Sequence, residues 1–70
     1  MDNLTKLLVD LGGDAGLEAR YRNDPDAVLA EYDLSDEAAA AMKKGDLEAL
    51  RKLSGLDELR LTNSTVKAYR

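Results

Sequence analysis

The sequence contains neither cysteine nor histidine. No disulfide can therefore stabilise the fold, and no His/Cys metal cluster can form. The same absences remove the thiol nucleophile and the imidazole general base. A carboxylate pair remains, but a chain of 70 residues offers little room for a deep pocket. We therefore expect no catalytic residue, no metal site and no cofactor bound by this chain, and we predict that it is not an enzyme.

Phenylalanine and tryptophan are also absent, proline occurs once, and leucine and alanine supply most of the apolar side chains. This composition favours helices over a β-sandwich. A chain this short forms one domain at most, and without disulfides its small core needs regular helix packing or a partner. The sequence predicts an all-α fold, a compact bundle of about five short helices with an extended C-terminal tail.

Long hydrophobic runs are missing as well, and the first residues lack the basic and apolar regions of a signal peptide. We therefore expect a cytoplasmic protein that does not contact a membrane. The formal net charge of −4 is unevenly distributed, because 60–70 contains Arg60, Lys67 and Arg70 but no acidic side chain. The acidic remainder of the chain disfavours nucleic acid as a partner.

The first helix is marked by leucines at the i, i+3, i+4 and i+7 spacing of one helical face, namely Leu4, Leu7, Leu8 and Leu11. Gly12 and Gly13 are predicted to end this helix by taking a left-handed C-cap conformation. Leu17 and Tyr21 share the face of a second helix.

Four further positions favour the starts of helices because their side chains can accept from free backbone N–H groups. They are Asp14, Asp24 before Pro25, Ser35 and Asp46. Gly45 and Gly55 are predicted to end the fourth and fifth helices. The last helix has the buried spacing Leu47, Leu50 and Leu53. Such leucine faces are typical of a core, although a bundle this small can leave one face for a partner.

The helical pattern ends at Gly55. Thr62, Thr65 and Val66 are β-branched and favour extended backbone. The stretch 61–66 is uncharged, and every residue in it has a backbone N–H. These properties fit a frayed terminus, and they also fit a strand-like substrate bound in the cleft of another enzyme.

Two stretches, DPDAVLAEYDLSDE (24–37) and GDLEALRKLSG (45–55), resemble the small helical subunit of the protocatechuate 4,5-dioxygenase type of extradiol dioxygenase. The recognition domain of borosin precursors has the same fold. Over about the first 55 residues, the chain looks most like a stand-alone precursor of a split borosin system. Dioxygenase small subunits tend to continue with a histidine-containing segment, whereas this chain has no histidine.

The resemblance implies a ribosomally synthesised precursor peptide with a helical recognition domain at 1–55 and a linker and core peptide at 56–70. A separate S-adenosylmethionine (SAM)-dependent α-N-methyltransferase would bind the recognition domain in a hetero-oligomeric complex. That partner would hold SAM or S-adenosylhomocysteine and methylate backbone amides of the core peptide. The candidate partner-binding residues lie on the helices: Leu4, Leu7, Leu8, Leu11, Tyr21, Pro25, Leu50 and Leu53.

Reach from the Ser54-Gly55 anchor selects which amides are modified, because an extended chain covers about 3.3 Å per residue. On this basis the candidate modified amides are those of Asn63 and Thr65, with Leu61, Thr62, Ser64 and Val66 as alternatives. Two other functions stay open: a non-catalytic small subunit of a ring-opening dioxygenase, and a generic adaptor bundle that binds one partner through a helix face.

Overall fold

The computed structural model describes residues 3–56, 58–62 and 65–68, with only the backbone of Thr62. The helices are α1 (Asn3–Gly13), α2 (Ala15–Asn23), α3 (Pro25–Glu31), α4 (Asp36–Lys44) and α5 (Leu47–Ser54). Two strands follow, β1 (Leu59–Thr62) and β2 (Thr65–Ala68). The predicted compact set of five short helices is confirmed over these residues, but the fold is mostly helical rather than all-α.

The helix starts follow the predicted side-chain caps. A carboxylate or hydroxyl oxygen accepts from the backbone N–H three residues later at Asp14, Asp24, Ser35 and Asp46, over 3.1–3.3 Å. Gly45 and Gly55 end α4 and α5 with φ of +68° and +77°, a left-handed conformation that glycine adopts without steric cost. These local predictions are confirmed.

The prediction that Gly12 and Gly13 form a left-handed C-cap is wrong. Both lie inside α1, and neither has a positive φ. Gly12 instead permits a close approach of two backbones, since a Cβ atom at this position would overlap with the carbonyl oxygen of Ala68. α1 stops because Asp14 is extended and begins the next helix.

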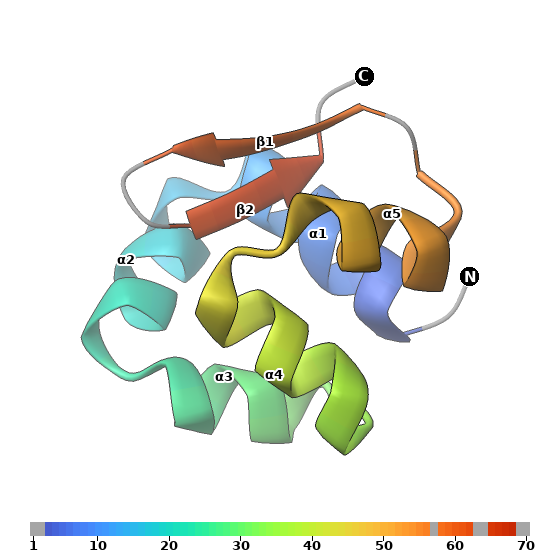
Figure 1. Ribbon diagram of the computed structural model, residues 1–70. Helices are drawn as coiled ribbons and strands as arrows, with labels where there is room; N and C mark the ends of the chain where they lie inside the picture. Colours follow the sequence, from blue (N-terminus) through green and yellow to red (C-terminus); the bar gives the residue numbers. More distant parts are fainter. Residues whose placement is uncertain (1–2, 57, 63–64, 69–70) are drawn as a thin grey trace.

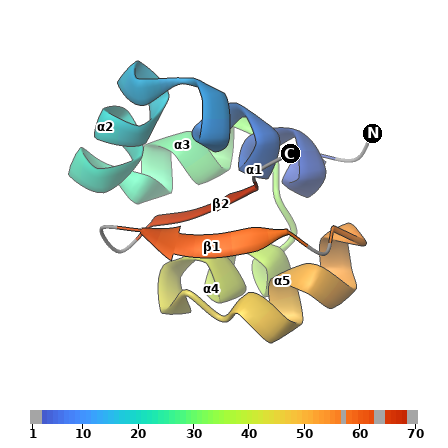
Figure 2. The ribbon, with the colours of Figure 1, turned by 90° about the horizontal axis from the view of Figure 1, so that it is seen from above.

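The predicted extended tail is a β-hairpin packed on the helices. β1 and β2 are antiparallel, with Leu61 opposite Val66 and Thr62 opposite Thr65. Figure 1 shows the two strands lying across the helices, and Figure 2 shows β2 on the side of α1 and β1 on the side of α5. The segment has the extended backbone that its composition favours, but it folds back on the bundle because its apolar side chains complete the core.

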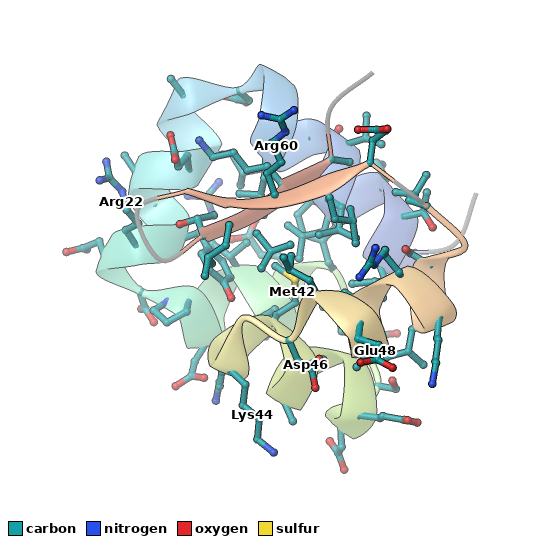
Figure 3. All side chains as sticks on the ribbon, turned by 45° about the horizontal axis from the view of Figure 1, so that its top comes forward. Arg22, Met42, Lys44, Asp46, Glu48 and Arg60 are labelled. Atoms are coloured by element: carbon teal, nitrogen blue, oxygen red, sulfur yellow. The ribbon has the colours of Figure 1, made fainter. Side chains whose placement is uncertain are left out.

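The core combines helical leucines with residues of β2. Leu7, Leu8, Leu50 and Val66 are fully buried. Met42 points from α4 into the centre of the molecule, while Lys44 at the end of the same helix points away from it (Figure 3). The C-terminal hairpin (59–62 and 65–68) therefore shares one hydrophobic core with the helices.

Candidate functional site

The C-terminal hairpin contains the described residues that were predicted to be methylated. Thr65 and Val66 of β2 are completely buried, whereas the side chain of Leu61 on β1 is 51% exposed. Leu61 also packs near Gly45, where an added Cβ would lie 3.3 Å from a Leu61 methyl carbon. Thr62 lies in β1 opposite Thr65. The predictions for Asn63 and Ser64 lie outside the described residues.

The two faces of β2 carry different chemistry. In an antiparallel pair, residues opposite each other point to the same side of the sheet. Leu61, Val66 and Ala68 therefore share an apolar side, while Thr65 and Lys67 share the other. All four residues of β2 are buried, so both faces of this strand are covered.

The polar face of β2 meets α2. The ammonium group of Lys67 forms an ion pair with the carboxylate of Glu18, and the two side chains are only 11% and 15% exposed. Tyr21 lies one turn after Glu18 on the same face of α2. We call Glu18, Thr65 and Lys67 the α2–β2 polar interface, and Tyr21 lies beside it on α2. Burial raises the pKa of the Tyr21 phenol, and the negative charge of Asp26 adds to this effect.

Several polar atoms in or beside this interface lack hydrogen bonds. Among the described residues, the buried side-chain oxygens without a hydrogen-bond partner are Glu18 Oε2, Tyr21 OH and Thr65 Oγ1. Of these, Glu18 Oε2 has the Lys67 ammonium as its partner in the ion pair, so the two hydroxyls are the unpaired atoms. A buried hydroxyl without a partner costs about 1–3 kcal/mol of folding free energy. The contact between α2 and β2 is therefore weaker than its burial suggests.

Most of the predicted partner-binding side chains are core residues. Leu4, Leu7, Leu8, Leu11, Tyr21 and Leu50 are buried. Leu53 is 36% exposed, and Pro25 is half-buried at the start of α3. A partner can therefore reach Leu53 and Pro25 in this conformation, while the other six stabilise the fold that presents them.

Leu53 lines two depressions of about 290 and 250 Å³. Leu4, Leu34 and Ala38 line the first, and Asp46 and Glu48 line the second. Glu48 forms an i,i+4 ion pair of 3.7 Å with Lys52, also on this surface. The surface is thus apolar around Leu53 and largely acidic at its edge.

A further cleft of about 630 Å³ lies between α1, α2 and Tyr32. The Tyr32 hydroxyl donates to Asp10 Oδ2 over 2.7 Å. Burial, this hydrogen bond and nearby carboxylates raise the pKa of the Tyr32 phenol from 10 to about 12. Arg20, which lines the cleft, pairs with Glu31. These contacts join α1, α2 and α3. The polar residues of this cleft therefore have a structural role in holding together the helical body, the five helices of residues 3–54.

The described residues form neither a metal site nor a membrane span. Across 3–56, 58–62 and 65–68, no three acidic side chains are grouped to hold a metal ion. Nor is any helix in the described part of the chain long and apolar enough to cross a bilayer.

Three residues of the site were not expected from the sequence: Gly12, Glu18 and Lys67. Gly12 was interpreted as a helix end, and Lys67 as a charge on an extended tail. The available signal was the alternation of Leu59, Leu61, Val66 and Ala68 with polar residues, since such alternation predicts strands.

The comparisons with known proteins add no relative. No protein-family model, curated protein or solved structure matches the chain.

Proposed function

We propose that this chain is a precursor peptide whose helical body binds a separate SAM-dependent methyltransferase, which methylates backbone amides in the C-terminal segment. The observation that carries the proposal is the change of backbone after Gly55, where a capped helical body gives way to two short extended strands. An extended backbone is the conformation that a strand-binding cleft selects. The resemblance of 24–37 and 45–55 to borosin recognition domains supplies the reaction.

The reaction requires a backbone amide whose N–H is not hydrogen-bonded within the chain. The amide nitrogen is a poor nucleophile because its lone pair is delocalised into the carbonyl group. In the proposed reaction, a base on the methyltransferase takes the N–H proton while the nitrogen bonds to the methyl carbon of SAM. The carbon–sulfur bond of SAM breaks, and S-adenosylhomocysteine leaves. The chain contributes the amide and its position, and the partner contributes the base and the methyl donor.

The fold determines which state of the chain the partner can use. Thr65 and Val66 are buried between the helices and β1, so their amides are not open to an active site while the hairpin is closed. Leu61 lies on β1 with an exposed side chain. We therefore propose that the enzyme acts on a hairpin that has separated from the body.

Co-expression with a methyltransferase encoded beside the chain tests the proposal. Trypsin cleaves after Lys52, Arg60 and Lys67, so peptide 61–67 contains five of the six candidate amides, those of residues 62–66. The Leu61 amide is the bond cut after Arg60, so methylation there should block this cut and appear in the longer peptide 53–67. Tandem mass spectrometry should show the modified peptide heavier by one CH₂ unit per methyl group, with the added mass assigned to single residues. A peptide of unchanged mass in a purified complex of the two proteins would sink the proposal.

Matched variants separate backbone from side-chain methylation. Thr65→Val keeps the shape of the side chain and removes its hydroxyl group. Backbone methylation at position 65 should persist in this variant, whereas methylation of the threonine oxygen would be lost. Thr62→Val serves the same purpose at position 62.

The packed hairpin favours a second candidate function, an adaptor bundle, because β2 contributes Val66 and Ala68 to the core. An adaptor would bind its partner with the C-terminal segment closed and chemically unchanged. Hydrogen exchange of the complex distinguishes the two functions. In an adaptor, the protection of the amides of 65–68 should rise or stay constant. In a precursor bound to its enzyme, β2 should lose its contacts with β1 and gain contacts with the active site.

A further inference from the structure

β2 is held by contacts that differ from those of the rest of the core. Its polar face bears Thr65 and Lys67, which are buried against α2. Removing an ion pair such as Lys67–Glu18 from water costs much of what the attraction between the charges returns. The Thr65 hydroxyl, on the same face of β2 as Lys67, has no hydrogen-bond partner in the described residues. The polar face of β2 therefore contributes little net free energy to the association of β2 with α2, relative to the surface area that it buries.

The apolar face of β2 is small. It consists of Val66 and Ala68, and the backbone of Ala68 lies directly against Gly12 of α1. Because Gly12 has no side chain, this contact is between backbones and buries few methyl groups. Helical core residues such as Leu7 and Leu50 bury larger side chains. Val66 and Ala68 are thus smaller side chains than the leucines that α1 and α5 contribute to the core.

The remaining support for β2 comes from β1. A two-stranded sheet is marginally stable on its own. β1 lies on the α5 side of the hairpin and leaves Leu61 half exposed. The helices, in contrast, are closed by their own caps at Asp14, Asp24, Ser35 and Asp46. The hairpin depends on the body, whereas the helix ends do not depend on the hairpin.

We infer that the C-terminal hairpin is a latch: it separates from α1 and α2 in a local opening that leaves the five helices folded. The α2–β2 polar interface keeps the closed state weak, and the Gly12–Ala68 contact sets its position. That the open state presents Thr65 and Val66 to a methyltransferase rests on the proposed function. The opening itself is a property of the chain alone.

Hydrogen exchange of the isolated chain tests the opening. Amides of 65–68 should exchange at least tenfold faster than those of Leu7, Leu8 and Leu50. The β2 amides can exchange through the local opening as well as through global unfolding, whereas the helical amides exchange only when the whole chain unfolds. Equal rates for β2 and for these helical amides would overturn the latch, since β2 would then open only when the whole chain unfolds.

A glycine pair in α1 provides a matched control. Gly12→Ala places a methyl group against the Ala68 carbonyl, while Gly13→Ala meets nothing within 4 Å. Gly12→Ala should accelerate exchange of 65–68 at least tenfold beyond Gly13→Ala and leave α3 and α4 unchanged. The same acceleration in α3 and α4 would contradict a local opening.

A second variant should move the equilibrium in the opposite direction. Glu18→Leu with Lys67→Met replaces the buried ion pair with apolar side chains of similar size. Exchange of 65–68 should slow severalfold in this variant, which remains informative if Gly12→Ala does not fold. Faster exchange would show that the ion pair holds β2 closed, and unchanged exchange would show that it has no net effect. Either result would overturn the assignment of the polar interface as the weak side of β2.

Methylation of the same variants separates the two proposals. With the methyltransferase below saturation, Gly12→Ala should be methylated faster than Gly13→Ala, and the Glu18→Leu/Lys67→Met variant more slowly than the natural chain. If exchange follows the expected order and no variant gains mass, the latch stands and the proposed function fails. If all variants are methylated at one rate despite different exchange, closure does not limit modification.

Discussion

At the scale of single residues, Tyr32 shows how the fold changes the chemistry of one group. Its hydroxyl donates to Asp10, and burial together with this bond raises the pKa to about 12. The folded chain thus holds the phenol proton more tightly than the unfolded chain, whose value is near 10. The resulting stabilisation is fully present below pH 10 and is lost as the pH rises towards 12.

Tyr32→Phe should remove this pH dependence. At neutral pH the variant should lose about 1 kcal/mol of unfolding free energy, because one hydrogen bond to a carboxylate is gone. Between pH 10 and 12 the natural chain should lose stability faster than the variant. Urea unfolding at several pH values and tyrosinate absorbance measure these two effects. A natural chain and a variant with the same slope above pH 10 would contradict the assignment.

At the scale of elements, α5 carries a buried and an exposed leucine one turn apart. Leu50 is fully buried, while Leu53 is 36% exposed and lines two surface depressions. Leu50→Ala should cost about 2–5 kcal/mol because it leaves a cavity in the core. Leu53→Ala should cost less than about 1 kcal/mol, since a half-exposed side chain loses little burial.

For chains that are folded, the affinity for a partner should depend on Leu53 more than on Leu50, the reverse of their effects on stability. If the methyltransferase binds the helical body where the sequence predicted, Leu53→Ala should weaken the complex about 5- to 30-fold, the range expected for an apolar anchor. Arg51→Ala, at an exposed position of the same helix that lines neither depression, is the control and should change the affinity less than about twofold. Titration calorimetry measures both. Equal affinities for the two variants would place the docking surface elsewhere.

The elements also show why sequence reasoning succeeded for helices and missed the hairpin. A cap such as Ser35 depends on a backbone N–H three residues away, so the signal is local. The β2 strand depends on a partner strand and on Gly12, which is distant in the sequence. Its alternation covers only four residues on each side of Asn63 and Ser64, which is a short signal beside five helical stretches.

The same distinction between local and distant contacts applies to the site. The β-branched residues of 61–66 correctly predicted an extended backbone. They could not predict that Thr65 would be buried, because burial depends on where α1 and α2 pack. Lys67 shows this most directly: the sequence placed its charge on an extended tail, whereas in the fold Glu18 provides a buried counterion. The composition of this segment predicts its extended backbone, whereas tertiary packing determines whether a partner enzyme can reach it.

At the scale of the whole molecule, the hairpin changes what removal of the C-terminus would test. Deleting 60–70 removes Val66 and Ala68 from the core and uncovers the face of α1 at Gly12. Loss of function in the deleted chain would therefore not by itself separate a precursor from an adaptor. The deletion is informative about stability instead, because a latch requires a helical body that folds without it.

The chain lacking 60–70 should stay helical and unfold at a lower temperature. Losing the burial of one valine and one alanine costs about 2 kcal/mol, which lowers the melting temperature of a domain this small by about 8–16 °C. Circular dichroism during heating measures both quantities. The double substitution Val66→Ala with Thr65→Ala, which shortens side chains but keeps the segment, is the control and should fall between the natural and the shortened chain. A shortened chain without helical signal at low temperature would mean that the hairpin is part of the folding unit, and the helices would then not form a body from which it can separate.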